Sequence, residues 1–395
     1  MPDDPIVIAS IARTPLGSFQ GCFRGLAAHE LGARAIRAAV DRAQIHPDEI
    51  DEAILGNVLS AGQGQAPARQ AVLGAGLPMS THCTTVNKMC GSGMKAAMLA
   101  HDLLLAGGNQ VMVAGGMESM TNAPYLLLKT RSGQRMGHGQ LMDHMFLDGL
   151  EDAYEKGALM GAFAESCAQR YGFTRQAQDE FAITSLTRAQ NASNNGGFDA
   201  EVVPVVVRGK KGETIIEKDE QPFKAQIEKI PHLKPAFKKN GTVTAANSSS
   251  ISDGAAAMVL MRQSTARSRG IRPRAVILGH STHAQEPGWF TTAPVGAIEK
   301  LLASIGWKTD DVDLFEVNEA FAVVTMAAMR EHHIEHSKIN IHGGACALGH
   351  PIGASGARIV VTLLSALERR NLKRGLASLC IGGGEATAMA IERYP

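Results

Sequence analysis

The chain has 395 residues, a formal net charge of +1, many glycines and few aromatic residues. This composition is typical of a soluble α/β enzyme, and the length allows two domains or one domain with a large insertion. The lack of a basic block in the sequence argues against nucleic-acid binding, and no apolar run reaches the roughly eighteen residues that cross a membrane.

The six cysteines are scattered and form no Cys-x-x-Cys pair, so neither a zinc site nor a disulfide framework is predicted. The first residues lack the apolar core of a signal peptide, and the last residues are not a peroxisomal address. These observations favour a cytoplasmic enzyme whose thiols stay reduced.

The first part of the chain predicts alternating strands and helices that lead to a glycine turn. Strands are expected at 6–9 and 50–57, and an amphipathic helix at 31–43. A polar, β-prone run leads into Val86-Asn87-Lys88-Met89-Cys90-Gly91-Ser92-Gly93, after which helical periodicity begins. Cys90 is therefore expected at a helix N-terminus, where free N–H groups and the helix dipole favour a thiolate. It is a candidate nucleophile, with a buried apolar cysteine as the alternative.

Residues 119–247 differ from the segments on either side. They contain more polar residues and turns, and their helical periodicity is clearest at 160–171 and 175–191. We interpret them as a loop domain inserted into an α/β unit whose last strand follows at 254–261. The expected boundaries are 1–118 together with 248–271 for the first half, 119–247 for the loop domain, and 272–395 for the second half.

The second half repeats the first. Residues 50–57 resemble 312–319, Ser92-Gly93 resembles Ser355-Gly356, and 111–118 resemble 378–385, all in the same order. An amphipathic helix at 295–305 precedes the first of these repeats, as 31–43 does in the first half. The chain therefore reads as two copies of one α/β unit. Corresponding turns of the two copies are expected to face each other across a pseudo-twofold axis.

Three segments of the second half carry further candidate residues. The glycine-rich turn 343–356 contains His350, which could take the proton of Cys90, although alone such a histidine is more often structural. Asn318 follows an expected strand, where an amide can hold a water or cap a helix. Cys380, in Cys380-Ile381-Gly382-Gly383-Gly384, adds a second thiol beside flexible backbone, with a core cysteine as the alternative.

The segments 86–93, 318–322, 343–356 and 380–384 resemble the four signature blocks of the thiolases, and the resemblance covers essentially the whole chain. It implies a thiolase fold, in which two duplicated α/β halves pack as a five-layer α-β-α-β-α core with an inserted loop domain. It also implies a homo-oligomer, a dimer of dimers. Within the family, the sequence is most similar to acetyl-CoA C-acetyltransferases, which condense two acetyl-CoA molecules to acetoacetyl-CoA and CoA.

The resemblance implies a role for each candidate. Cys90 would carry the acyl group, His350 would accept its proton, and Cys380 would remove the α-proton of the second acetyl-CoA. Asn318 would hold a water that forms one oxyanion hole with His350, and the backbone N–H groups of Cys90 and Gly382 would form the other. No metal or other cofactor is expected, because the coenzyme A thioesters are substrates.

The resemblance also places coenzyme A against the loop domain, where 242–250 matches the pantetheine-binding segment of the family. The residues expected to contact substrate are Ser249 and Ala246 in this segment, Phe237 and Phe321 as apolar walls, Leu159 and Met160 beside the thioester, and Lys224 near the adenine.

Three positions depart from the pattern of acetoacetyl-specific members. Leu159 stands where a histidine is usual near the thioester, and Ala386 stands where a further glycine is common. The arginine usual near the adenine is missing from the run that contains Phe223 and Lys224, and a lysine lacks the planar fork of an arginine.

Three alternatives to an acetyl-CoA acetyltransferase follow. The nearest is a broader-specificity 3-ketoacyl-CoA thiolase of fatty-acid degradation, which shares every catalytic residue. A ketoacyl-carrier-protein synthase is disfavoured by the second cysteine. A non-catalytic acyl-CoA-binding protein on the same fold would be expected to have lost the nucleophile or the histidine.

Overall fold

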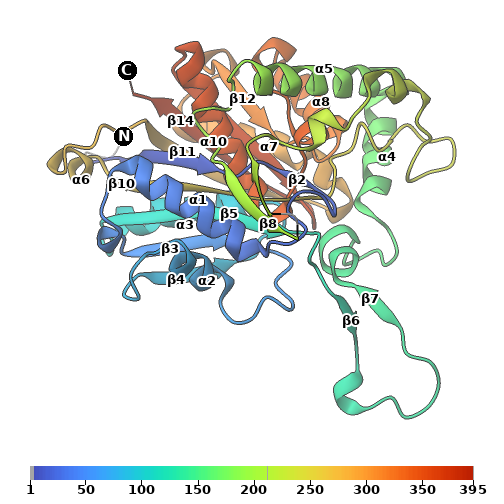
Figure 1. Ribbon diagram of the computed structural model, residues 1–395. Helices are drawn as coiled ribbons and strands as arrows, with labels where there is room; N and C mark the ends of the chain where they lie inside the picture. Colours follow the sequence, from blue (N-terminus) through green and yellow to red (C-terminus); the bar gives the residue numbers. More distant parts are fainter. Residues whose placement is uncertain (1–3, 211, 395) are drawn as a thin grey trace.

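The computed structural model describes residues 4–210 and 212–394 (Figure 1). A ten-stranded sheet runs through it, built from β1 (Ile6–Arg13), β2 (Gly17–Ser18), β3 (Glu52–Gly56), β4 (His82–Val86), β5 (Val111–Ser119), β10 (Ser252–Arg262), β11 (Ala275–Ala284), β12 (Leu314–Val317), β13 (Arg374–Ile381) and β14 (Glu385–Arg393). The strand order is β12-β13-β14-β11-β1-β10-β5-β3-β4, and β2 pairs with β10 beside this path.

The sheet consists of two halves with the same strand order. In the first half β3 is parallel to β4 and β5, while β10 is antiparallel to β5 and β1. In the second half β12 is parallel to β13 and forms a parallel bridge through Ile339, while β14 is antiparallel to β13 and β11. The halves join where β1 pairs with β11 through Val7–Val276 and Ile8–Ala275. The repeat in the sequence therefore corresponds to a repeat in the structure.

Helices form three layers around these half-sheets, which confirms the expected five-layer core. α1 (Ala28–Ala43) and α2 (Pro67–Gly74) cover the outer face of the first half. α7 (Ala293–Ile305) and α8 (Ala322–His332) cover the outer face of the second. Between the half-sheets lie α3 (Ser92–Ala106) and α10 (Ile352–Arg370), whose apolar side chains form one cluster with residues of both half-sheets.

The segment between β5 and β10 contains a projecting hairpin, two long helices and a second small hairpin (Figure 1). These are β6 (Tyr125–Leu127) with β7 (Leu141–Asp143), α4 (Met160–Tyr171), α5 (Arg175–Asn194), and β8 (Val205–Gly209) with β9 (Gly212–Ile216). The helix predicted at 160–171 is confirmed, and the one predicted at 175–191 extends to Asn194. Although this segment interrupts the first half, α4 packs its Ala164 and Cys167 into the apolar cluster of the second half.

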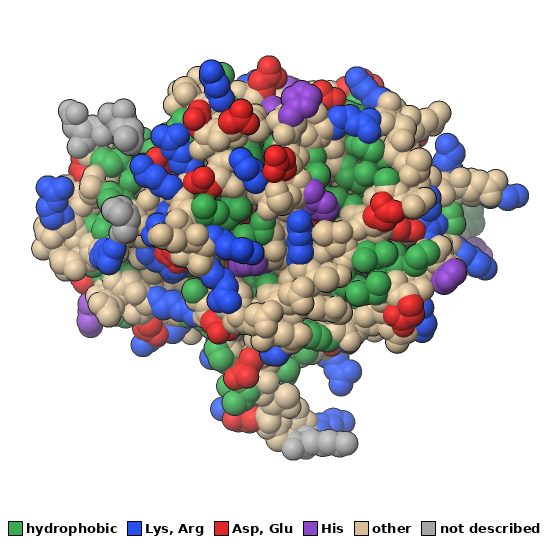
Figure 2. Space-filling model, turned by 90° about the horizontal axis from the view of Figure 1, so that it is seen from above, with side chains coloured by type: hydrophobic (Ala, Val, Ile, Leu, Met, Phe, Trp, Pro, Cys, Tyr) green, Lys and Arg blue, Asp and Glu red, His purple; other side chains and the backbone are tan. Residues whose placement is uncertain are grey.

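Short elements complete the fold: α6 (Gln263–Ser268), α9 (Ala345–Leu348), a π-helical turn at Phe146–Leu150, and 3₁₀ turns at Pro47–Glu49, Thr130–Ser132, Gln221–Phe223, Ile227–His232, Pro287–Thr292, Thr309–Asp311 and His336–Lys338. Among the described residues, no helix combines the length and apolarity needed to cross a bilayer. Seen from above, basic and acidic side chains lie intermixed on the surface (Figure 2).

Candidate active site

A cavity of about 430 Å³ opens where both halves and the inserted segment meet. Nine of the predicted site residues line it: Cys90, His350, Cys380, Gly382, Ser249, Phe237, Phe321, Met160 and Leu159. Ala246 and Lys224 do not line it. A larger surface cavity of about 940 Å³, lined by residues such as Arg188 and Arg370, contains none of the predicted site residues.

The turn that presents Cys90 is held tightly at the start of α3. Met89 has a left-handed backbone with φ of 46°, and the hydroxyl of Ser92 accepts from the N–H of Lys88 at 2.8 Å while donating to the carbonyl of Met89 at 2.6 Å. A Cβ on Gly91 would lie 2.3 Å from Cδ1 of Ile381, so a larger residue would displace the end of the Ile381 side chain from this turn. This contact brings Cys90 next to Cys380.

An ion pair reinforces the same contact between the halves. Lys88, beside Cys90, pairs with Glu385, which follows the glycines after Cys380. Both side chains are partly buried, so the pair is less screened by solvent than a surface pair.

Glycines also place the starts of α3 and α10 directly against each other. A Cβ on Gly93 would lie 2.8 Å from the backbone nitrogen of Ala357, and one on Gly356 would lie 2.4 Å from that of Met94. A Cβ on Gly116 of β5 would lie 2.1 Å from the carbonyl oxygen of Gly353. Because the turns before the two helices carry Cys90 and His350, this close packing brings nucleophile and histidine to one cavity. The corresponding turns meet, as the duplication predicts.

The hydrogen bonds of His350 show which of its ring nitrogens carries the proton. Its Nδ1 lies 2.5 Å from the hydroxyl oxygen of Ser355, and that hydroxyl donates to the carbonyl of Pro351 at 2.9 Å. Nδ1 therefore carries the hydrogen and donates it to Ser355, which leaves Nε2 with a lone pair. Nε2 is buried and has no partner among the described residues. Burial, with a smaller effect of Arg358, lowers the pKa of His350 to about 3, so the ring is a neutral base.

Asn318 lies beside this histidine, behind the cavity wall. Its Nδ2 is 3.4 Å from Nδ1 of His350, and its Oδ1 is buried without a partner among the described residues. A buried amide oxygen of this kind is a position that an ordered water commonly satisfies. The water-holding role of Asn318 stays a prediction.

The protonation state of Cys90 differs from the expectation of a thiolate. Burial raises the pKa of its thiol to about 11, although the N–H groups of Gly382 and of Cys90 itself act in the opposite direction. The desolvation of a sulfur anion thus outweighs the helix N-terminus. Burial also raises the pKa of Cys380 well above its usual value, and the neighbouring Cys90 raises it further. At rest, the site holds two neutral thiols and a neutral imidazole.

Two buried glutamates support the site, although the sequence alone assigned neither of them a role. Glu118 accepts from the backbone N–H groups of Val58, Leu59 and Gly353 at 3.0, 3.2 and 3.0 Å, and burial raises its pKa to about 7. It therefore fixes the start of α10 to the end of β3. Glu319 plays a similar part in the second half, accepting from Ser185, Asn340 and Cys346.

The apolar side of the cavity is built on α4 and the segment before β10. The rings of Phe237 and Phe321 meet edge to face with centroids 6.0 Å apart. The N–H of Ser249 donates to the carbonyl of Ala320 at 2.9 Å, which ties the predicted pantetheine-binding segment to the turn after β12. Leu159 caps α4 and faces the cavity with Met160.

Two predicted substrate contacts and two departures lie away from this wall. Ala246 packs into an apolar cluster with Leu16 and Leu186. Lys224 pairs with Glu220 at 2.5 Å, so its charge is already engaged. Phe223 is half exposed, and Ala386 is buried in β14.

Comparisons with known proteins identify the family of the chain. Residues 6–264 match the thiolase N-terminal domain, and residues 271–393 match the thiolase C-terminal domain. The chain belongs to the thiolase family. It is 50% identical over 390 residues to acetyl-CoA acetyltransferase 2 of Arabidopsis thaliana, covering 98% of this chain and 96% of that protein. This membership makes the chain an acyltransferase.

Solved thiolase structures share the whole fold. The crystal structure of the Bacillus anthracis acetyl-CoA acetyltransferase superposes with a TM-score of 0.96 at 40% identity, covering 99% of both chains. A thiolase from Ascaris suum in complex with coenzyme A superposes with a TM-score of 0.93, also at 40% identity, covering 99% of this chain and 100% of that one.

Proposed function

We propose that this chain is an acetyl-CoA C-acetyltransferase, which joins two acetyl-CoA molecules into acetoacetyl-CoA and CoA and also runs the reverse thiolysis. The observation that carries the proposal is the convergence of Cys90, His350, Cys380 and Gly382 on one cavity. Full-length similarity to acetyl-CoA acetyltransferases supports the same substrate class.

The thiolysis direction shows what each neutral group does. The thiol of Cys90 gives its proton to Nε2 of His350, and its sulfur attacks the 3-keto carbon of acetoacetyl-CoA. The carbon–carbon bond breaks, and the departing carbanion of acetyl-CoA takes the proton of Cys380. A thiol with a raised pKa still holds that proton near neutral pH, so the acid is ready when the bond breaks.

The second half-reaction restores the resting site. The thiol of CoA gives its proton to the thiolate of Cys380, and the CoA sulfur attacks the acetyl group on Cys90. Acetyl-CoA leaves, and the sulfur of Cys90 recovers its proton from His350. Each half-reaction passes through a tetrahedral oxyanion. The N–H of Gly382, which lies beside the sulfur of Cys90, is a suitable donor for one of them, worth about 3–4 kcal/mol.

The lining of the cavity bears most directly on the acyl-chain preference of the enzyme. Its wall carries Leu159, Phe146, Leu150 and Ile352, which offer apolar surface and no charge. This favours tolerance of chains longer than acetoacetyl, as in a broader-specificity 3-ketoacyl-CoA thiolase. Coenzyme A thioesters are substrates in either case, and the proposed chemistry uses no metal or cofactor.

The proposal also includes a cytoplasmic homo-oligomer. The projecting hairpin exposes Tyr125, Leu127 and Leu141 at 64%, 45% and 68% of their surfaces, and apolar side chains exposed to this extent are typical of association surfaces. Light scattering at micromolar concentration tests it, and a monomer would contradict it.

A pre-steady-state experiment tests the reaction itself. Acetyl-CoA alone should release a burst of free CoA equal to the enzyme concentration and leave one acetyl group on the peptide that contains Cys90. Steady-state thiolysis of acetoacetyl-CoA compared with longer 3-ketoacyl-CoA substrates then separates the two specificities. Absence of the burst, with label elsewhere or nowhere, would refute the proposed function.

A further inference from the structure

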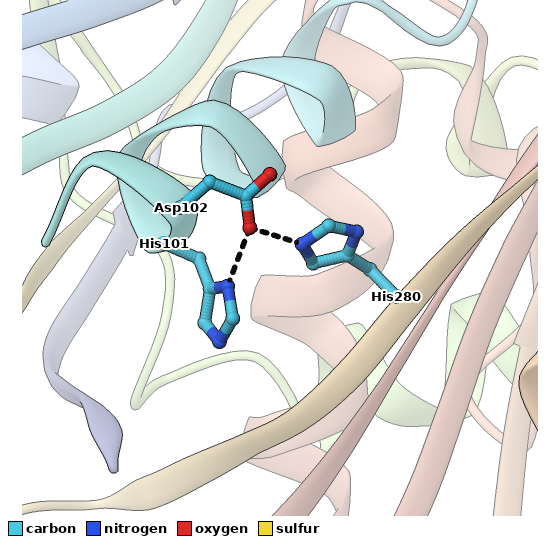
Figure 3. Close-up of side chains that lie close together, drawn as sticks. All are labelled: His101, Asp102 and His280. Carbon is cyan, nitrogen blue, oxygen red and sulfur yellow. Dashed lines mark hydrogen bonds and ion pairs between the residues drawn. The ribbon is translucent and has the colours of Figure 1, made fainter. Parts of the chain in front are cut away.

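Three side chains with metal-binding atoms meet outside the catalytic cavity (Figure 3). His101 and Asp102 come from α3 in the first half, and His280 comes from β11 in the second. One carboxylate oxygen of Asp102 lies 3.0 Å from Nδ1 of His101 and 2.9 Å from Nε2 of His280. None of the three residues lines the cavity.

The environment of this cluster is that of a built site rather than a chance surface contact. The imidazoles of His101 and His280 are only 11% and 17% exposed, so packing holds both rings in place. The ring centroids are 5.0 Å apart with the planes nearly perpendicular, at 88°. The carboxylate of Asp102 is 52% exposed, which leaves one side open to solvent.

The geometry also suits a small divalent ion. The three ligand atoms all lie within 4.8 Å of one another. In a tetrahedral zinc site, bonds of about 2.0–2.2 Å separate the ligand atoms by about 3.4 Å. The two separations between carboxylate and imidazole, 3.0 and 2.9 Å, would widen by about half an ångström, which rotation of the exposed Asp102 can supply. The two imidazole nitrogens, which lie within 4.8 Å of each other, would move together by up to about 1.4 Å through rotation of the rings. Two imidazoles and a carboxylate form a common donor set for zinc, with water as a fourth ligand.

We propose that His101, Asp102 and His280 form a binding site for a divalent transition-metal ion of the zinc class. The bound ion joins α3 of the first half to β11 of the second, and so stabilises the contact between the halves. It takes no part in acyl transfer. The ion would replace the two hydrogen bonds that the shared carboxylate oxygen now accepts from the histidines.

The test uses the full chain after treatment with a chelator. Zn²⁺ is titrated against a chromogenic indicator, and Co²⁺ is then used as a spectroscopic substitute. We expect one equivalent to bind, with visible cobalt bands but without the near-ultraviolet sulfur-to-cobalt band that a cysteine site gives. We also expect the midpoint of thermal unfolding to rise with Zn²⁺, because an ion that binds the native state stabilises it.

Variants locate the ion. His280→Ala should weaken Zn²⁺ binding by more than about 10-fold, since losing even an outer-shell partner costs that much. His46→Ala is the matched control, because His46 forms an exposed pair with Asp48 and belongs to no group of three possible metal ligands among the described residues. Exchange of labelled CoA into acetyl-CoA should be unchanged in His280→Ala, which shows that it is folded. Equal zinc binding by wild type and His280→Ala, or a sulfur-to-cobalt band, would overturn the proposal.

Discussion

Replacing Gly356 by alanine tests whether the contact between α3 and α10 sets the geometry of the site. The new Cβ would lie 2.4 Å from the backbone nitrogen and 2.9 Å from the Cβ of Met94, whereas ordinary contact begins near 3.4 Å. The helix starts must therefore separate by up to about 1 Å. Overpacking of this kind costs about 1–3 kcal/mol of folding free energy. The separation also moves Cys90 away from His350, and a misplacement of about 1 Å costs about 100-fold in rate.

The assay is exchange of labelled CoA into acetyl-CoA, which requires acyl transfer but no carbon–carbon chemistry. Gly356→Ala should reduce the exchange rate by about 100-fold and lower the midpoint of thermal unfolding by a few degrees. Gly108→Ala is the matched control, because no atom lies within 4 Å of its added Cβ. A folded Gly356→Ala protein that exchanges CoA at the rate of the wild type would refute the reasoning.

Three further predictions concern the thiols, the acyl pocket and the histidine. Cys380→Ser should abolish thiolysis of acetoacetyl-CoA but retain CoA exchange within about 10-fold, because CoA leaves readily as a thiolate whereas a carbanion needs a proton. Cys90→Ser should lose both thiolysis and exchange. Equal loss of exchange in the two variants would contradict the division of roles. Leu159→His should lower kcat/KM for long 3-ketoacyl-CoA substrates relative to acetoacetyl-CoA by about 10-fold, because a polar ring replaces apolar wall; an unchanged ratio would exclude this position as a determinant. His350 is neutral when folded down to about pH 3 but protonates near 6.5 when unfolded, so its contribution to stability is present above pH 6.5 and is lost as the pH falls towards 3. In urea titrations, the unfolding free energy of the wild type should therefore fall relative to that of His350→Asn as the pH is lowered from 7 to 5. A constant difference would contradict the lowered pKa.

The sequence predicts the parts of the site that depend on local order along the chain. Cys90 lies in the turn between β4 and α3, His350 in the turn before α10, and Cys380 near the end of β13 before the glycine turn to β14. Such glycine turns are visible as short motifs. The duplication then indicates which turns meet. The repeat predicts two copies of one α/β unit, and the resemblance to the thiolases implies that they pack as a five-layer core.

Features that depend on distant residues are not visible in this way. The neutral state of Cys90 results from burial by other segments, so the local helix N-terminus suggested the wrong protonation state. His101 and His280 lie 179 residues apart in the sequence and meet only in the fold, so no spacing along the chain indicates their cluster.

The middle layer has a bearing on the ancestry of the fold. α10 is buried from Ile352 to Leu367, and with α3 it is enclosed by side chains from both half-sheets. A single α/β unit would leave this face of its helix in water, so an ancestral half-length chain would have needed a second, identical copy to cover it. Duplication and fusion of such a unit would turn a contact between copies into a contact within one chain. Once the two turns were no longer copies of one sequence, one could keep a cysteine while the other acquired a histidine.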